Sequence, residues 1–489
     1  MYKREDIPRR LEHVAAGIVG YGVYIPKFRL ERSEIGKAWQ GGGKGEKSVL
    51  GSDEDVVTMA VEAALNAVEV AGIDPTRDLG AVYLGCTSAP YFEHSSAGLV
   101  AESLGVRTDA ESADFGASTR SSFAALKACV DAVAAGRMKY GLVIGTDSRP
   151  GAPGSAGEQT FGAAAAAIIV GSEAPIAGLD RDYTYSTRFI DRWRTPADEF
   201  VREYDPRFTR EYGYTKHVIG AAKGFAERTG VAIGSFRHVV LQHVDERLTS
   251  AAANAIGATP EQMAKGDLGR RVGDAGNASA LLGLAAVLDV AAPGERILAI
   301  SYGSGTSDVV SLTMGDGLGR RIERSCEYYL SGKEYMDYIT YLKRAGILEE
   351  SGEKARPAVP PVSPLLERDS EALHRLLGAR CTKCGYMNIP PSLRKICVRC
   401  GNTSFEIKEI ARRGRVHTFC INYYMPAPFD SPMPIIVADL EDGTRYQAAG
   451  TEMKPGEISI DMPVDLVLRS IIVDRGARVY GYKYRGSRN

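Results

Sequence analysis

The chain has 489 residues, 44% of them apolar, and it carries 60 basic against 61 acidic side chains, a formal net charge of -1. This length suggests two to four domains with large cores, and the balanced charge argues against binding to nucleic acid or to an acidic membrane. Residues 1–13 lack an apolar core, and no apolar run reaches about 18 residues, so we expect a cytoplasmic protein without a membrane segment.

The first 350 residues predict an α/β domain built from layers of strands and helices. Short apolar runs typical of buried strands alternate with long helical patterns, such as residues 53–71 and 278–291. The strand-like runs lie at residues 81–85, 141–145, 165–170, 239–241 and 297–302. Such an alternation is typical of α/β folds.

Residues 114–122 place hydroxyl groups at the start of a helix predicted over residues 123–135. Two interpretations of Ser118 and Thr119 stay open. Their side chains either cap the helix N-terminus or act as nucleophiles. The segment contains no cysteine.

His243 follows the apolar run 239–241 at the expected C-terminal end of a buried strand. Open α/β sheets present functional groups at that end of their strands. A neutral imidazole there is a candidate base for a carbon next to a carbonyl, or a hydrogen-bond donor to an oxyanion. A hydrogen-bonded structural histidine is the alternative.

Two further loops carry candidate residues. Residues 273–279 open a helix, so Asp274 and Asn277 either cap it or point into a site. Residues 302–307 follow the strand 297–300, and Gly303, Ser304 and Gly305 could bring main-chain donors to a bound carbonyl oxygen. A simple turn would need glycine as well.

After residue 350 the sequence changes character. Residues 351–364 form a Pro-, Gly- and charge-rich linker, and residues 365–408 combine a helix over 364–377 with a zinc ribbon. The ribbon carries two CxxC pairs, Cys381 with Cys384 and Cys397 with Cys400, which predict a closed tetrahedral Zn²⁺ site that is structural. The other four cysteines form no disulfide framework.

Residues 409–489 predict a small β-barrel of the OB type. Five short strands are expected at residues 414–424, 433–440, 445–449, 464–473 and 478–485. Aromatic and basic residues alternate over 480–485, which fits either a half-buried strand or a nucleotide-stacking face.

Several segments in this order resemble HMG-CoA synthase of the archaeal type, within the thiolase superfamily. Residues 17–26, 46–49 and 51–55 are similar to the opening of that family. Further similar segments lie at 189–194, 205–209, 216–217, 282–289 and 301–304. The likeness runs from about residue 17 to about residue 347.

This resemblance implies a five-layered α/β/α/β/α domain, usually dimeric, with a coenzyme A tunnel that leads to a buried site. The family takes a histidine and an asparagine from the C-terminal half. His243 matches the histidine. For the asparagine, gap-free alignment selects Asp274, whereas the Gly-Asn-x-Ser pattern of ketoacyl synthase III relatives selects Asn277.

The N-terminal half departs from the family at both of its chemical positions. Thr119, with Ser118 beside it, stands where the family has its nucleophilic cysteine, so no thiolate forms there. Thr87 stands at the position of the catalytic glutamate. The neighbouring Cys86 is expected to be a small buried residue.

The ribbon and barrel, residues 365–486, resemble the small zinc proteins that accompany archaeal thiolase and HMG-CoA synthase and help to enclose the CoA channel. In this chain such a module is fused to the larger domain. The resemblance also makes a thiolase a candidate partner.

An acyl-CoA thioester is therefore the expected substrate, and the missing thiol favours aldol or retro-aldol chemistry on a β-hydroxyacyl-CoA. His243 would act as base or oxyanion donor, with Asn277 or Asp274 as its polar partner. Tyr183, Tyr185 and Tyr214 are candidates for the missing acid.

Two alternatives stay open. One is a Claisen-type acyltransferase that uses Ser118, Thr119 or free CoA as nucleophile. The other is a non-catalytic CoA-binding scaffold for a thiolase.

Overall fold

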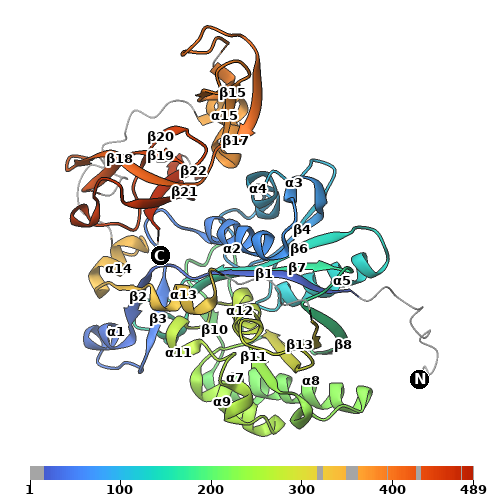
Figure 1. The fold of residues 1–489 in the computed structure, drawn as a ribbon. Coiled ribbons are helices and arrows are strands. Elements are labelled where there is room, and N and C mark those ends of the chain that lie inside the picture. The colour runs from blue at the N-terminus through green and yellow to red at the C-terminus, as the bar shows by residue number, and fades with distance from the viewer. Residues whose placement is uncertain are drawn as a thin grey trace.

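The computed structural model describes residues 16–316, 323–348, 362–393, 395–425, 431–474 and 476–487, with the side chains of 362–367 and 474 left out. Figure 1 shows a large α/β domain, a small β-barrel docked on it, and a ribbon that projects beyond the barrel. Residues 351–361 of the predicted linker lie outside the described residues.

A nine-stranded sheet with the order β11-β12-β13-β8-β1-β7-β6-β4-β5 organises the first domain. It consists of two halves, joined where β1 pairs with β8 at Gly17–Gly178 and Ile18–Ala177. The N-terminal half contains β1 (Gly17–Tyr24), β4 (Leu79–Gly85), β5 (Glu111–Phe115), β6 (Tyr140–Ser148) and β7 (Ala163–Gly171). The C-terminal half contains β8 (Ala177–Ser186), β11 (His238–Leu241), β12 (Arg296–Gly303) and β13 (Thr306–Met314).

Helices complete the five expected layers. The helix α2 (Val56–Ala71) covers the outer face of the N-terminal half, and α8 (Tyr214–Thr229) covers the outer face of the C-terminal half. Between the halves lie α5 (Ser121–Ala134) and α12 (Asn277–Leu288). Every residue of α12 is buried, because it contacts strands of both halves, and this explains its apolar sequence on all sides.

Local signals set the ends of α2. The Asp55 side chain accepts hydrogen bonds from the backbone N–H groups of Val57 and Thr58 in a capping box, and Gly72 ends the helix at φ 64°. The remaining elements of this domain surround the layers. The strands are β2 (Phe28–Glu31), β3 (Glu46–Val49), β9 (Arg192–Trp193), β10 (Arg202–Glu203) and β14 (Glu334–Tyr335). The helices are α1 (Arg32–Trp39), α3 (Pro75–Asp78), α4 (Ser96–Ser103), α6 (Ala156–Thr160), α7 (Pro206–Tyr212), α9 (Glu246–Ile256), α10 (Pro260–Met263), α11 (Gly269–Val272), α13 (Cys326–Ser331) and α14 (Tyr338–Arg344).

The C-terminal strands form a five-stranded barrel with the order β20-β19-β18-β21-β22. Its two ends meet where Thr451 N–H donates to the carbonyl oxygen of Tyr484, 2.8 Å away. Tyr480, Tyr482 and Tyr484 of β22 are all buried, and Arg485 on the opposite face is only 5% exposed because it packs against the first domain. The strand is therefore buried on both faces, in place of the expected half-buried strand, and these aromatic rings offer no stacking face. The strands are β18 (Arg413–Asn422), β19 (Met433–Leu440), β20 (Arg445–Ala449), β21 (Pro463–Asp474) and β22 (Ala477–Gly486).

The ribbon joins the rest of the molecule through α15 (Val362–Arg375). This helix packs against α4 and β22, and the Tyr482 hydroxyl donates to the His374 carbonyl oxygen, 3.0 Å away. The ribbon sheet consists of β15 (Leu377–Cys381), β16 (Met387–Asn388) and β17 (Phe405–Glu409).

Buried ion pairs fasten the barrel to the first domain. Lys483 Nζ lies 2.8 Å from Asp53 Oδ2, and Arg485 Nη2 lies 3.1 Å from Glu62 Oε2. The Tyr480 hydroxyl donates to Asp55 Oδ2 over 2.7 Å. Acidic residues at the start of α2 thus meet basic strands of the barrel.

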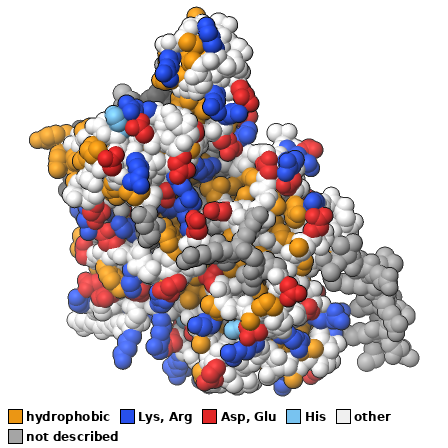
Figure 2. All heavy atoms as spheres, viewed as in Figure 1, with side chains coloured by type: hydrophobic (Ala, Val, Ile, Leu, Met, Phe, Trp, Pro, Cys, Tyr) orange, Lys and Arg blue, Asp and Glu red, His pale blue; other side chains and the backbone are white. Residues whose placement is uncertain are grey.

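On the outer surface, basic and acidic side chains are interspersed across the face shown in Figure 2. In the described parts of the chain, no helix is long and apolar enough to cross a membrane.

Candidate active site

A cavity of about 470 Å³ lies between the two halves of the first domain. The N-terminal half contributes Thr87, Ser118 and Thr119 to its wall, and the C-terminal half contributes Asp274 and Tyr302. The structure therefore brings together several positions that the sequence singled out, from loops far apart in the chain.

At the nucleophile position, neither predicted hydroxyl caps the helix. Arg120 occupies the N-cap of α5 and makes no side-chain cap bond. The Thr119 hydroxyl donates to the Tyr302 carbonyl oxygen over 2.9 Å, whereas the buried Ser118 Oγ has no hydrogen-bond partner. An added Cβ at Gly303 would lie 2.2 Å from that Oγ, so glycine lets the two loops meet.

The glutamate position is occupied by a hydrogen-bonded hydroxyl. Thr87 donates to Asp147 Oδ1 through its backbone N–H (2.7 Å) and its side chain (2.9 Å). The Cys86 thiol also donates to this carboxylate, over 3.5 Å, and burial raises its pKa well above the usual range. Cys86 is thus a buried thiol, as expected.

Asn277 is buried and is not among the residues that line the cavity. Its Nδ2 donates to Asp147 Oδ2 (3.0 Å) and to the Ser118 carbonyl oxygen (3.1 Å), and its Oδ1 accepts from the Ser122 N–H over 2.9 Å. All hydrogen-bonding groups of this amide are occupied except one lone pair of Oδ1. Asn277 therefore ties the nucleophile loop to Asp147 and does not cap α12.

Asp274 lines the cavity and is 1% exposed. Its Oδ2 pairs with Arg149 Nη2 and lies 3.2 Å from Arg192 Nη1. Both guanidinium groups lie over the Phe161 ring, at 4.2 and 5.4 Å from its centroid. The position that gap-free alignment assigns to the family asparagine thus carries a carboxylate held by two arginines.

His243 is buried. The next residue, Val244, lines the cavity, but His243 is not among the described residues that line it. Its Nδ1 lies 3.4 Å from Asp267 Oδ1, a charge contact without hydrogen-bond geometry, and its Nε2 also has no hydrogen-bond partner. The histidine holds the pKa of the Asp267 carboxyl below its usual range. The partner of His243 is therefore Asp267, in place of the expected Asn277 or Asp274.

Gly303, Ser304 and Gly305 form the tight hairpin between β12 and β13, where Gly303 pairs with Thr306. Ser304 lines the cavity, and its hydroxyl lies 2.7 Å from Asp191 Oδ1. This places the loop beside the cavity, with Ser304 supporting Asp191.

The three tyrosines considered as acids are placed differently. Tyr214 lines the cavity and donates to the Gln242 carbonyl oxygen over 2.7 Å, and burial raises its pKa. Tyr183 and Tyr185 pack against Gly224 and Gly220 of α8 and do not line the cavity.

Two further cavities lead from this region toward the barrel. The nearer, about 370 Å³, shares Arg149 with the first cavity. The farther, about 430 Å³, is lined by barrel residues such as Lys483, and shares Ser52, Arg344 and Arg478 with the nearer one.

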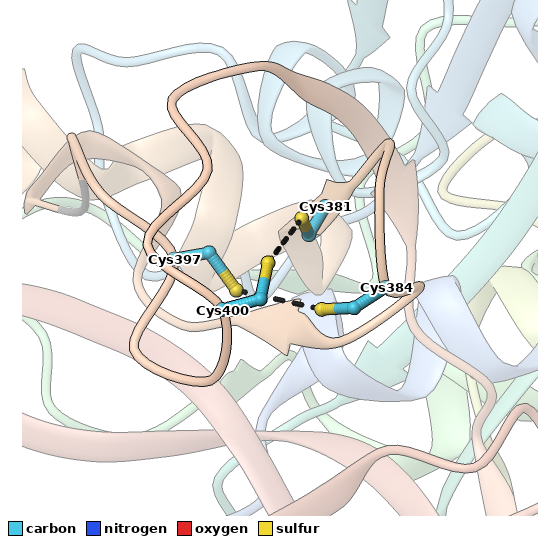
Figure 3. A group of neighbouring side chains, drawn as sticks. All are labelled: Cys381, Cys384, Cys397 and Cys400. Atoms are coloured by element: carbon cyan, nitrogen blue, oxygen red, sulfur yellow. Dashed lines mark hydrogen bonds between the residues drawn. The ribbon is translucent and has the colours of Figure 1, made fainter.

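The four ribbon cysteines converge as predicted (Figure 3). Their ligand atoms all lie within 4.8 Å of one another, and the Sγ atoms of Cys381 and Cys400 are 3.6 Å apart. A tetrahedral ion with Zn–S bonds near 2.3 Å requires sulfur separations of about 3.8 Å, so the group fits Zn²⁺. Gly385 and Gly401, each directly after a pair, adopt φ of 73° and 72°, a left-handed conformation that suits glycine in a tight turn.

Sequence reasoning missed the residues that organise the cavity. Asp147 and Arg149 lie at or just beyond the end of β6, in a segment without a recognisable motif. Asp191 lies in the family-like segment 189–194, but no pattern there marked it as a cavity residue. Gly269 packs directly against His243, because an added Cβ there would lie 1.9 Å from His243 Nδ1.

The fold is that of the thiolase superfamily. The chain is similar to MvaS in complex with 3-hydroxy-3-methylglutaryl coenzyme A, at 21% identity and a TM-score of 0.62, covering 71% of this chain and 94% of that one. It is also similar to 3-oxoacyl-(acyl carrier protein) synthase III, FabH, from Pseudomonas aeruginosa PAO1, at 19% identity and a TM-score of 0.55, covering 62% and 99%.

Relatives with similar sequences identify the family within this superfamily. The hydroxymethylglutaryl-CoA synthase of Methanocaldococcus jannaschii is 40% identical over 339 residues, 67% of this chain and 98% of the relative. That of Methanothermobacter thermautotrophicus is 39% identical over 344 residues, 68% and 99%. The chain therefore belongs to the HMG-CoA synthase family and is an enzyme of the thiolase superfamily.

The barrel has its own relationship. Residues 408–469 match the family model described as ChsH2, C-terminal OB-fold domain. This match confirms the predicted OB fold.

Proposed function

We propose that the protein makes or breaks a carbon–carbon bond in an acyl-CoA by aldol or retro-aldol chemistry on a β-hydroxyacyl-CoA, without an acyl-enzyme. The observation that carries this proposal is that no cysteine in the described cavity wall is placed to act as a thiolate nucleophile. Cys86 is the one thiol in the described cavity wall, and its raised pKa and its contact with Asp147 keep it protonated. The hydroxyl of Ser118 has no base beside it.

In the cleavage direction a base takes the proton of the β-hydroxyl group, the Cα–Cβ bond breaks, and the β-carbon becomes a carbonyl. The electron pair moves onto the thioester carbonyl oxygen as an enolate, which then takes a proton at Cα. His243 is the candidate base, and Asp267 would hold its ring and stabilise the imidazolium. Condensation is the reverse sequence.

The three cavities support a CoA thioester as the substrate. Each shares wall residues with the next, so the three cavities together would accommodate a long thioester between the barrel interface and the catalytic cavity. Arg344, Arg478 and Lys483 line the farthest of these cavities and would pair with the phosphates of CoA. The barrel would thus help to bind CoA, as the resemblance implies.

The four-cysteine group would hold Zn²⁺ in a structural role, because four thiolates leave no ligand position for water. Homodimerisation through the first domain, a thiolase as partner and a cytoplasmic location remain predictions.

A second candidate function is Claisen-type acyl transfer. The buried, unpartnered Ser118 Oγ in the cavity wall favours Ser118 over Thr119 as its nucleophile. Direct attack by free CoA is the other route.

Mass spectrometry after incubation with a panel of β-hydroxyacyl- and β-ketoacyl-CoAs tests the proposal. Cleavage of a β-hydroxyacyl-CoA to a shorter acyl-CoA and a carbonyl product, with no label retained on the protein, is expected. A stable acyl group on Ser118 or Thr119 from radiolabelled substrate would replace it with acyl transfer. No turnover of any substrate would favour the scaffold.

A further inference from the structure

Arg149 occupies the boundary between the catalytic cavity and the nearer of the two outer cavities. It follows β6 directly, is 8% exposed, and among the described residues it alone lines both cavities. Consecutive residues of one segment alternate between the two cavities there, since Thr87 and Ala89 line the catalytic cavity while Ser88 and Pro90 line the other.

The Arg149 side chain keeps a buried donor free. Its Nη2 pairs with Asp274, and its plane is held over the Phe161 ring at 4.2 Å. Its Nε is buried and has no hydrogen-bond partner in the protein. An unsatisfied donor on a buried guanidinium costs free energy, so a ligand oxygen that reaches it would be bound strongly.

The other two arginines of the catalytic cavity differ. Arg192 is shared between Asp274 and Glu203, and Arg194 donates to the Thr87 carbonyl oxygen over 3.1 Å. Both line the catalytic cavity, and neither lines one of the two outer cavities. Arg149 is therefore the one of these three arginines that lines both the catalytic cavity and the nearer outer cavity.

We propose that Arg149 binds the thioester carbonyl oxygen of the acyl-CoA and stabilises the enolate that forms on it. This proposal rests on the function proposed above. A thioester that passes from the outer cavities into the catalytic cavity would cross at Arg149, with its CoA arm on one side and its reacting acyl carbons on the other. A fixed cation in a site with little water stabilises a developing oxyanion more than it stabilises the neutral carbonyl.

Exchange of α-hydrogens for deuterium in acetyl-CoA, followed in D2O by mass spectrometry, measures enolate formation apart from bond cleavage. Arg149→Met should lower the exchange rate by about 100-fold or more with a small effect on KM, because the interaction strengthens in the transition state. Arg149→Lys should retain part of the rate. Added guanidinium ion should partly restore Arg149→Ala.

Arg192→Met is the matched control. It removes the second guanidinium group that contacts Asp274 and Phe161 but leaves Arg149 in place, so we expect the exchange rate to fall by at most about 10-fold. Thermal unfolding of each variant identifies any that fails to fold.

The outcomes separate the two proposals. Wild-type exchange that persists unchanged in Arg149→Met overturns the role of Arg149 and leaves the proposed function standing. Equal losses in Arg149→Met and Arg192→Met, without guanidinium rescue, also overturn it, because they indicate a structural ion cluster. Absence of both exchange and turnover in the wild type overturns the proposed function, and this inference with it.

Discussion

The side-chain amide of Asn277 donates to the Asp147 carboxylate over 3.0 Å, and this contact joins the two halves of the first domain. The same carboxylate accepts two hydrogen bonds from Thr87 and one from the Asn277 backbone N–H, 2.8 Å away. One buried carboxylate therefore positions both the loop of the missing glutamate and the start of α12.

Asn277→Ala should lower the free energy of unfolding by about 2–4 kcal/mol, because it leaves Asp147, the Ser118 carbonyl and the Ser122 N–H short of partners. Chemical denaturation measures the change. Asn254→Ala, at an exposed position of α9, is the control. Equal stability of the two variants would contradict the anchoring role.

His243→Ala should lower kcat by about 10²- to 10⁴-fold with the fold retained, as expected for loss of a general base. Asp267→Asn should cost less, about 10-fold, because Asp267 acts through the histidine. Steady-state kinetics on the substrate found by mass spectrometry provide the measurement. Full activity of His243→Ala would assign the base to another residue.

The helices, the strands and the four cysteines of the predicted zinc site could be predicted from the sequence, because each depends on a local sequence pattern. A long apolar run marks α12, alternation marks β22, and CxxC spacing marks Cys381 with Cys384. The ion pairs of the cavity could not be predicted from the sequence, because Asp274 contacts Arg149 only when the two halves of the domain pack together. For the same reason spacing could not decide between Asp274 and Asn277, whereas burial and hydrogen bonds give them different places.

The interface between barrel and first domain should depend on the buried pair Glu62 and Arg485. Each single change to Ala leaves an unpaired buried charge and should cost about 3–5 kcal/mol of unfolding free energy. The double variant should cost less than the sum, as a double-mutant cycle would show. The exposed pair Arg207 and Glu211 serves as control and should show little coupling. Additive losses at the buried pair would rule out its direct interaction.

Lys47 should make stability rise with pH above neutrality. Burial lowers its pKa to about 7, whereas a lysine in an unfolded chain stays protonated to about pH 10. Between these values the unfolded state binds more protons, so the free energy of unfolding increases with pH.

Lys47→Met removes this contribution, up to about 1.4 kcal/mol per pH unit. Denaturation of both proteins between about pH 7 and about pH 9 isolates the difference, since other groups are common to both. Lys37→Met, at a side chain that is 72% exposed, should keep the wild-type slope. An unchanged slope in Lys47→Met would show that this amine stays charged in the folded protein.

Removal of Zn²⁺ should unfold the ribbon, because a module of this size depends on its metal for stability. Chelation and Cys397→Ser should both abolish metal binding in native mass spectrometry, while Cys420→Ser, at an exposed cysteine outside the four-cysteine group, should not. We also expect weaker binding of the CoA ester, since α15 links the ribbon to β22 of the barrel through His374 and Tyr482. The ribbon itself lines none of the three cavities described, so its effect must pass through this helix. Unchanged CoA-ester affinity in the metal-free protein would confine the role of zinc to the ribbon's own fold.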